Sequence, residues 1–307
     1  MEENGQIVYG IDIGGTEIKV VALNSDGTEI YRQSIPTEYD QQSLIRCIEK
    51  IVSADDKSAT KRRESVDSPL IGIASPGLAA KDNRSIVWMQ GRMETVQGLD
   101  WTESLSSKRL IPVVNDAHAA LLGEVWQGVV KGALDVVMLT LGTGVGGAAI
   151  VDGNLLRGHL GRAGHLGHIS LDTRGELDIV NTPGSLEDAV GNCTILARSE
   201  GRFSDTQTLV EAANNGDVFA QELWGETIIT LAAGITSFIN LFDPEIVILG
   251  GGMIAAGERL FHLLQAEMNR VEWRPTGTQV KIVPAKLGSY AGAYGAAYQA
   301  FKINSLI

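Results

Sequence analysis

Cysteine, positive charge and long apolar runs are all scarce in this chain. The two cysteines, Cys47 and Cys193, lie far apart and lack the spacing of a metal or redox pair, which favours two ordinary reduced thiols. The 37 acidic residues outnumber the 25 basic ones and give a net charge of −12. This charge argues against a nucleic-acid partner, because phosphates bind to basic surfaces.

We expect neither a membrane partner nor a secretory signal. The apolar stretch 231–242 is too short to cross a bilayer and predicts a buried helix, and residues 1–6 are polar and acidic. Hydrophobic residues make up 44% and charged residues 20% of the chain, as is ordinary for a soluble globular enzyme. A length of 307 residues exceeds what one hydrophobic core usually supports, so we expect two domains in a cytoplasmic protein.

Glycine, by contrast, is abundant and gathers in loops that follow apolar, strand-like runs. The first loop, at 12–16, lies between the runs 7–11 and 18–23 and has Lys19 nearby. It predicts a hairpin whose turn amides face an anion such as phosphate. A second copy lies at 142–147. One such loop alone is more simply a glycine-rich turn, but two copies indicate two related halves that face a shared ligand.

A third glycine cluster, at 250–252, follows a run that is typical of a buried strand. Glycine there allows the backbone to approach a nucleotide closely, because it has no Cβ atom. Apolar patterns elsewhere alternate between strands and helices. Besides the strands of the second glycine hairpin and the run 246–249, we expect strands at 7–13, 18–24, 28–34, 70–74, 111–114 and 280–284, and helices at 41–53, 117–126, 185–200, 206–215, 217–241, 256–270 and 290–302.

These loops and several other short motifs resemble the actin-like ATPase domain of the ROK family of sugar kinases and repressors. The glycine motifs are Asp-Ile-Gly-Gly-Thr-x-x-Lys at 12–19, Leu-Gly-Thr-Gly-Val-Gly-Gly at 141–147 and Leu-Gly-Gly-Gly at 249–252. More specific are Gly-Ile-Ala-Ser-Pro-Gly at 72–77, Val-Asn-Asp-Ala at 114–117 and Ala-Gly-His-Leu-Gly-His at 163–168. Together the motifs cover nearly the whole chain in the family's order.

The resemblance implies an α/β fold of two actin-like (ribonuclease H-like) domains with a nucleotide and sugar cleft between them. In the family the last helix packs back on the first domain, so we expect domains at 1–116 plus 291–307 and at 117–290. The implied activity is phosphorylation of a hexose or hexose derivative, with ATP and Mg²⁺ as cofactors. We also expect a homodimer or a higher homo-oligomer.

Asp116 is the residue that we assign to catalysis. A carboxylate at the end of a strand and the start of a helix can accept the proton of a sugar hydroxyl as that oxygen attacks the γ-phosphate. The same aspartate is also a good helix N-cap, and most aspartates in such places are only that. Its match to the family's catalytic aspartate favours the general base, and Asn115 would then orient a neighbouring hydroxyl.

The remaining site residues follow from the resemblance. Asp12 is either a turn-forming aspartate or a holder of Mg²⁺-bound water, and the resemblance favours the metal role. Lys19 is placed beside phosphate, although it could equally be a solvated strand lysine. The other phosphate contacts are expected at Gly14, Gly15, Thr16, Thr143 and Gly144, the adenosine at Gly251 and Gly252, and the sugar at Ser75, Gly77, Asn115, Asp116, His165, His168 and Glu187.

The chain departs from the family at three places. The substrate motif Glu-x-Gly-His begins with His165 here, and a neutral imidazole offers one donor and one acceptor where a carboxylate accepts from two hydroxyls. The zinc-binding stretch Cys-x-Cys-Gly-x-x-Gly-Cys aligns with Asp-Ile-Val-Asn-Thr-Pro-Gly-Ser at 178–185. One histidine and an aspartate remain, so we expect no zinc. Arg92 replaces a usual Asn-Leu segment and could bind a sugar substituent, or be a solvated charge or lid salt bridge.

Three classes of function compete. The leading class is an active sugar kinase, which Asp116, Asp12 and the three glycine loops favour. A ROK-type repressor needs an N-terminal winged-helix domain, for which a first strand at residue 7 leaves no room. A non-catalytic, sugar-sensing relative is suggested by the altered substrate motif and the missing zinc ligands. Glu187 is compatible with a sugar contact and equally with the acidic first turn of a helix.

Overall fold

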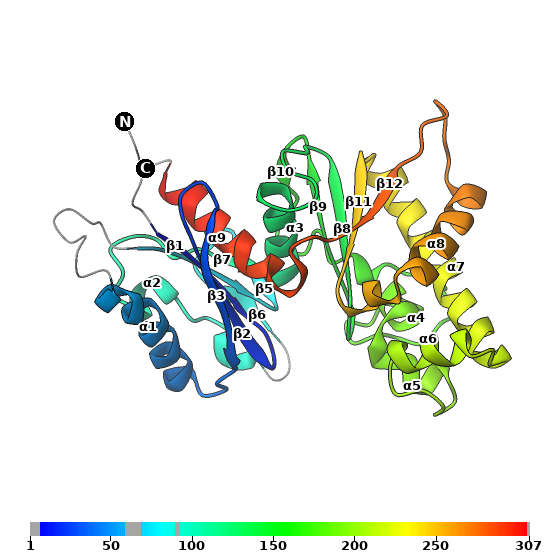
Figure 1. Ribbon diagram of the computed structural model, residues 1–307, viewed down its shortest axis with the longest axis horizontal. Helices are drawn as coiled ribbons and strands as arrows, with labels where there is room; N and C mark the ends of the chain where they lie inside the picture. The colour runs from blue at the N-terminus through cyan, green and yellow to red at the C-terminus, as the bar shows by residue number, and fades with distance from the viewer. Residues whose placement is uncertain (1–6, 59–68, 90–92, 306–307) are drawn as a thin grey trace. The chain divides into compact units, whose positions relative to one another are not determined.

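The computed structural model describes residues 7–58, 69–89 and 93–305, and the chain forms two compact units (Figure 1). The first unit comprises Met1–Gly132, Arg157–Arg162 and Lys286–Ile307, and the second comprises Ala133–Leu156 and Ala163–Ala285. These bounds differ from the expected ones, because helix α3 (Asp116–Trp126) packs on helix α9 (Ala291–Asn304) and so belongs to the first unit. Each unit is built on one mixed five-stranded sheet, which confirms the α/β class.

The sheet of the first unit has the strand order β3-β2-β1-β4-β7. Strands β1, β4 and β7 are parallel, whereas β2 and β3 continue the sheet in antiparallel pairs. The apolar runs placed most of these strands within two residues. Their bounds are Val8–Ile13 for β1, Glu17–Leu23 for β2, Glu29–Pro36 for β3, Leu70–Ser75 for β4 and Val113–Asn115 for β7.

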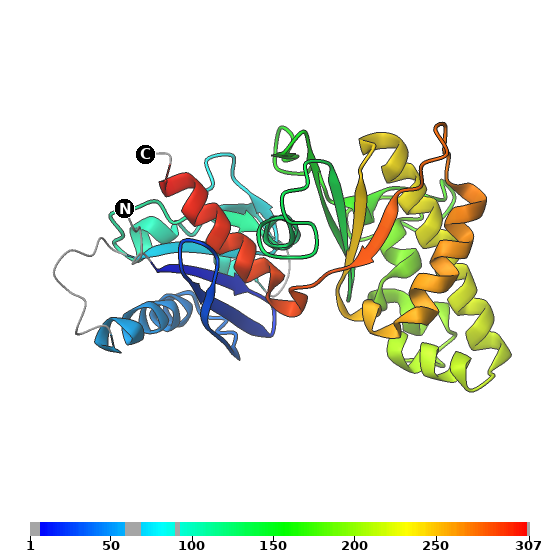
Figure 2. The same ribbon diagram turned by 45° about the horizontal axis from the view of Figure 1, so that its top comes forward.

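Helices cover both faces of this sheet, with α1 (Gln41–Ser58) on one face and α9 on the other (Figure 2). Helix α9 approaches the strands very closely. A Cβ atom at Gly10 would clash with the carbonyl oxygen of Ala293, and one at Gly72 would clash with that of Ala296. Glycine on β1 and β4 therefore allows a helix of small residues to lie directly on the sheet.

Short elements fill the stretch between β4 and β7, for which the sequence predicted no helix or strand. A two-stranded hairpin, β5 (Leu78–Ala79) and β6 (Ile86–Trp88), is followed by the 3₁₀ turn η1 (Glu94–Val96) and helix α2 (Trp101–Ser104). The Asp100 carboxylate caps α2 by accepting hydrogen bonds from the amides of Thr102 and Glu103. Elements this short leave no periodic signal in the sequence.

The sheet of the second unit has the order β10-β9-β8-β11-β12, and a glycine hairpin joins its strands β8 and β9. The hairpin is antiparallel, whereas β8, β11 and β12 are parallel. In both units a glycine hairpin lies beside a parallel strand, which confirms that the two halves have related architectures. The strands are β8 (Val136–Leu141), β9 (Val145–Val151), β10 (Asn154–Leu155), β11 (Ile246–Gly250) and β12 (Lys281–Pro284).

The prediction of a single helix at 185–200 is wrong. The chain forms α4 (Leu186–Val190), the 3₁₀ turn η3 (Asn192–Thr194) and α5 (Ile195–Arg198), with Gly191 extended between them. The amides of Asn192 and Cys193 donate to the carbonyl oxygens of Gly142 and Thr143, at 3.1 and 2.7 Å. These bonds to the glycine hairpin replace helical ones and break the helix.

Three longer helices, α6 (Thr206–Asn214), α7 (Val218–Phe242) and α8 (Glu258–Val271), complete the second unit near their expected positions. Helix α7 has 25 residues, and by length and composition alone it could cross a membrane. Its inner face, including Leu231, Ile235 and Phe238, is fully buried in the core of the unit. This packing is that of a core helix, as the sequence predicted for 231–242.

Candidate functional site

The carboxyl ends of the parallel strands β1, β4 and β7 bring four of the expected site residues to one edge of the first sheet. Asp12 is the second-to-last residue of β1. Ser75 is the last residue of β4, and Asn115 is the last residue of β7 and directly precedes Asp116. Asp12 pairs with Ala74, and Ser75 pairs with Asn115. The carboxyl edge of a parallel sheet is where α/β proteins commonly bind ligands.

Asp12 lies in a strongly perturbed environment. It is half-buried, stands opposite Lys19 on the neighbouring strand, and its Oδ2 lies 2.5 Å from where a Cβ atom on Gly292 of α9 would be. Burial, and next the negative charge of Asp116, raise the pKa of Asp12 to about 7, while Lys19 lowers it. The two carboxylates therefore oppose each other's ionisation, so a cation placed between them would be favourable.

Asn115, and not Asp116, is the N-cap of α3, so the capping interpretation of Asp116 is wrong. The Asn115 Oδ1 atom accepts hydrogen bonds from the amides of Ala117 and His118, at 3.0 and 3.2 Å, and its Nδ2 donates to the carbonyl oxygen of Gly77 at 3.0 Å. Asp116 is the first residue of the helix and its side chain is exposed. The capping geometry leaves the Asp116 carboxylate at the surface of the sheet edge.

The segment that follows β3 donates hydrogen bonds to the turn of the β1–β2 hairpin. Thr37 donates from its hydroxyl to the carbonyl oxygen of Gly14 and from its amide to that of Thr16, and the Tyr39 hydroxyl donates to that of Gly15. The Gly14 amide donates to Glu17 within the turn. Of the three phosphate contacts that the sequence predicted in this loop, the Gly14 amide is thus used within the turn, whereas no hydrogen bond from the amides of Gly15 and Thr16 to a described residue is found.

The β8–β9 hairpin is anchored by Glu187 on α4. Glu187 Oε2 accepts a hydrogen bond of 2.9 Å from the amide of Val145. A Cβ atom on Gly144 would clash with this oxygen, so Gly144 is required for the contact. Glu187 lies in the first turn of α4, as expected, and the sequence did not reveal that it binds the glycine loop.

The three glycine loops contain two kinds of glycine. Gly251 has a φ of +85°, and its Cβ atom would clash with the backbone of Leu141, so backbone conformation and packing both require glycine there. Gly15, Gly142 and Gly252 have neither constraint, because no atom of the described residues would meet their Cβ atoms within 4 Å. Open space beside each of these loops is what a ligand close to the backbone needs.

The segment His165–His168 packs against the start of β9, beside the second hairpin. It ends in a 3₁₀ turn, η2 (Leu166–His168), and a Cβ atom on Gly167 would clash with the carbonyl oxygen of Val145. His165 and His168 are both half-buried. The second unit thus places Glu187 and Gly167, which lies directly before His168, against one backbone position, Val145, that follows Thr143 and Gly144.

The segment 178–185 contains none of the three cysteines of the zinc motif. Asp178 takes the position of the first cysteine in the zinc motif, and His168 Nδ1 lies 2.8 Å from its Oδ2. Among the residues that the structure describes, no three histidine, cysteine, aspartate or glutamate side chains are grouped to hold a metal ion. A single imidazole and a single carboxylate do not fit the four ligands of structural zinc, and we keep the expectation that zinc is absent as a prediction.

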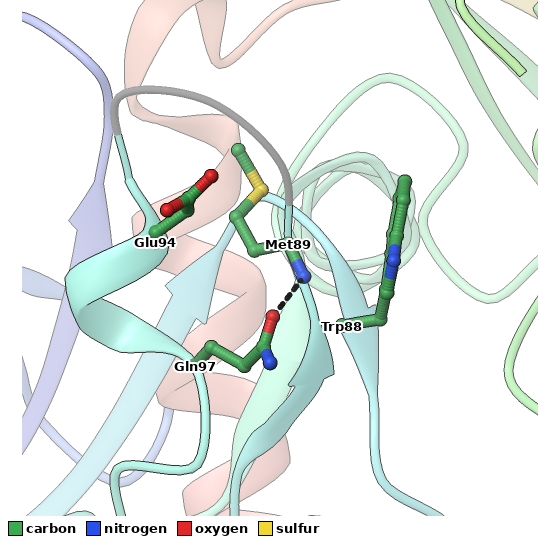
Figure 3. Close-up of a pocket in the computed structure, with 4 residues that line it drawn as sticks. All are labelled: Trp88, Met89, Glu94 and Gln97. Atoms are coloured by element: carbon green, nitrogen blue, oxygen red, sulfur yellow. Dashed lines mark hydrogen bonds between the residues drawn. The ribbon is translucent and has the colours of Figure 1, made fainter.

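A separate pocket of about 580 Å³ lies in the first unit between β6 and η1 (Figure 3). Trp88, Met89, Glu94 and Gln97 line it, and Gln97 Oε1 accepts a hydrogen bond of 2.9 Å from the amide of Met89. Two of these residues, Met89 and Glu94, flank the segment of Arg92 in the sequence. Arg92 itself lies outside the described residues, so its expected sugar contact stays a prediction.

The amino-acid sequence is similar to known sugar kinases over nearly its whole length. Residues 8–302 match the family model described as ROK family. A glucokinase from Thermotoga maritima is 30% identical over 313 residues, which cover 94% of this chain and 96% of the relative. The matched proteins are mostly sugar kinases, and some are regulators.

Solved structures give the same result. A ROK hexokinase from Thermus thermophilus matches with a TM-score of 0.85 and 26% identity. The match covers 98% of this chain and 100% of the hexokinase. A ROK family glucokinase from Streptomyces griseus, in complex with glucose and AMPPNP, matches with a TM-score of 0.73 and 26% identity, covering 96% and 99%. The first match confirms the two-sheet fold that the sequence predicted.

Proposed function

This chain belongs to the ROK family, and from that premise we propose that it is a cytoplasmic, ATP-dependent kinase of a hexose or hexose derivative. One observation carries the proposal: the exposed carboxylate of Asp116 lies at the carboxyl edge of the first sheet, close enough to Asp12 to raise its pKa. A carboxyl whose pKa is raised by burial and by a second carboxylate nearby is typical of a functional site, in which one group can act as a base and the other can serve a cation.

Asp116 is the general base in this proposal. Its exposed carboxylate can accept the proton of a sugar hydroxyl as the oxygen attacks the γ-phosphate in line. The Asn115 cap fixes the start of α3 and thereby the backbone that carries Asp116. The side-chain amide of Asn115 is largely used by the cap, so its contribution to sugar binding is limited to the second Nδ2 hydrogen.

Asp12 and Lys19 serve the phosphates and their metal ion. Mg²⁺, when bound with ATP, would neutralise phosphate charge and favour the ionised form of Asp12, whose carboxyl otherwise has a pKa of about 7. The amides of Gly15 and Thr16, which donate to no acceptor among the described residues, are proposed to bind a phosphate oxygen. In the second unit, Thr143 and Gly144 are proposed for the β- and γ-phosphates, and the open backbone at Gly252, with Gly251, for the adenosine.

Sugar recognition is proposed for Ser75, Gly77 and Asn115 in the first unit and for His165, His168 and Glu187 in the second. His165 replaces the family's glutamate, so at most one hydroxyl donates to it where a carboxylate would accept two. Glu187 already accepts one backbone hydrogen bond through Oε2. We propose that the preferred sugar differs from glucose at a hydroxyl that these residues contact.

The alternative is a non-catalytic, sugar-sensing member of the family. A screen of ATP consumption with hexoses, N-acetylhexosamines and sugar acids, with added Mg²⁺, separates the two possibilities. We expect sugar-dependent ADP release with at least one sugar, and loss of that release in Asp116→Asn. Binding of a sugar by calorimetry without any ADP release would support the sensor and contradict the kinase.

A further inference from the structure

We infer that the Asp178 carboxylate takes the place of the zinc ion in this chain, fixing the loop 178–185 and orienting His168 as a hydrogen-bond acceptor for the sugar. The orienting role rests on the proposed function. The role of Asp178 as the centre of the loop rests on the geometry of the second unit alone.

The backbone of the loop has a positive φ at both positions where the zinc motif has glycine. Asn181, at the first glycine of the motif, has a φ of +66°, and Gly184, at the second, has a φ of +51°. Asparagine is one of the few other residues that tolerates this left-handed conformation. The amide of Asp178 donates to the carbonyl oxygen of Thr182 at 3.0 Å and closes the turn.

The three positions where the motif has cysteine now converge on one carboxylate. The first is Asp178 itself, which is 7% exposed. From the second, the amide of Val180 donates to Asp178 Oδ1 at 2.9 Å, and the amide of Thr182 joins it at 2.8 Å. From the third, the side chain of Ser185 lies near enough to the same carboxylate to help lower its pKa. A buried carboxylate with this many donors can organise a loop as a metal ion does.

Asp178 remains ionised although it is buried. Burial alone would raise its pKa, but hydrogen bonds from the Thr182 amide, the His168 ring, the Val180 amide and Ser185 together hold the pKa of Asp178 below its ordinary value. An ionised carboxylate only accepts hydrogen bonds. His168 must therefore present a hydrogen on Nδ1, which lies 2.8 Å from Asp178 Oδ2.

The tautomer of His168 follows from this contact. With the hydrogen on Nδ1, the neutral ring has its lone pair on Nε2 and can accept a hydrogen bond from a sugar hydroxyl. The side chain of His168 is 21% exposed, so part of the ring can reach a ligand. The turn after His168 is tied to the same loop, because the amide of Leu186 donates to the carbonyl oxygen of Ile169 at 3.0 Å. Asp178 is thus a positioning residue that acts through His168.

Asp178→Asn tests the inference, because it keeps the size of the side chain and an acceptor for the two amides. Its NH₂ group would donate to His168 Nδ1 and move the ring hydrogen to Nε2, so His168 would become a donor toward the sugar. We expect the KM for the sugar to rise about tenfold or more, with little change in the KM for ATP. Glu176→Gln, which removes an exposed charge two residues before Asp178, is the matched control.

A spectroscopic measurement keeps the test independent of kinase activity. In a long-range ¹H–¹⁵N spectrum of histidine-labelled protein, the His168 signals, assigned with His168→Gln, should show the Nδ1–H tautomer in the wild type and Nε2–H in Asp178→Asn. An unchanged tautomer would overturn the inference even in an active kinase. If the tautomer changes as predicted but the protein shows no sugar-dependent ATP turnover, the proposed function is contradicted. The inference that Asp178 fixes the loop 178–185 then still holds.

Elemental analysis addresses the replacement of zinc directly. Wild-type protein should contain far less than one zinc ion per chain, and a chelator that is selective for zinc over Mg²⁺ should leave its activity and its His168 signals unchanged. One tightly held zinc per chain, or loss of the His168 signals with the chelator, would show that a metal ion and not Asp178 organises the loop.

Discussion

Glu187 on α4 accepts a hydrogen bond of 2.9 Å from the backbone amide of Val145, and this contact occupies the space above Gly144. This hydrogen bond joins two segments of the second unit that are far apart in the sequence, the glycine hairpin and the acidic first turn of α4. The family resemblance had placed Glu187 only beside the sugar. The structure shows that the same side chain also shapes the loop expected to bind phosphate.

The Gly144–Glu187 contact predicts a non-additive pair of substitutions. Gly144→Ala should destabilise the protein by about 0.5–1.5 kcal/mol, because the added Cβ atom displaces the Glu187 carboxylate and breaks its hydrogen bond to Val145. Glu187→Ala removes the obstacle, so the double variant should lose clearly less stability than the sum of the two single variants. Denaturant titration of the four proteins measures the coupling, and strict additivity would contradict the contact.

Asn115 should have separable roles in stability and in sugar binding. Asn115→Ala removes the N-cap of α3 and should cost about 1–2 kcal/mol. Asn115→Ser keeps an oxygen that accepts from the helix amides and should recover much of that loss, while both variants lose the Nδ2 donor. A sugar KM raised equally in both variants would show a direct sugar contact. A KM that follows stability would show that Asn115 acts only as a cap.

Asp12 predicts how stability depends on pH in the absence of ATP and Mg²⁺. Between its unfolded pKa of 3.8 and its folded pKa of about 7, the folded protein holds a proton that the unfolded chain has released. The contribution of protonated Asp12 to the free energy of unfolding is therefore fully present below the unfolded pKa of 3.8. It is lost as pH rises through the folded pKa of about 7. Asp12→Asn should gain several degrees in Tm relative to wild type at pH 8 and much less at pH 5. An equal gain at both pH values would contradict the raised pKa.

His165 predicts a change of sugar preference. Glu in place of His165 restores a carboxylate that accepts from two hydroxyls, so His165→Glu should shift kcat/KM toward glucose-like sugars. A hydrogen-bond mismatch is worth about 1–3 kcal/mol, which corresponds to roughly a tenfold shift or more. The check is a sugar-preference profile of wild type and His165→Glu. An unchanged profile would show that specificity lies elsewhere.

The sequence predicted most strands of both sheets and the last helix because their signals are local. Buried strands such as β4 and β11 are continuous apolar runs, and the small residues of α9 mark a helix that lies close to a sheet. The edge that carries Asp12, Ser75 and Asp116 was also predictable, because each residue ends a strand or follows it.

The features that the sequence did not predict depend on contacts between distant segments. The break between α4 and α5 arises from bonds to Gly142 and Thr143, which no local pattern reveals. Asn115 and Asp116 are both good caps, and only the end of β7 decides between them. The Asp178 cluster combines residues 168, 178, 180, 182 and 185, and its sole sequence signal is the absence of the expected cysteines.

Asp116→Asn tests the central claim most directly, because asparagine keeps the size of the side chain and cannot act as the base. The measurement is the turnover number with the best sugar from the screen, together with calorimetric Kd values for sugar and nucleotide. Glu49→Gln, which removes an exposed charge on α1 of the same unit, is the control. We expect both Kd values to stay within about a factor of two while kcat falls roughly 10²-fold or more, the scale of a lost general base. Turnover near the wild-type value would contradict the assignment of Asp116.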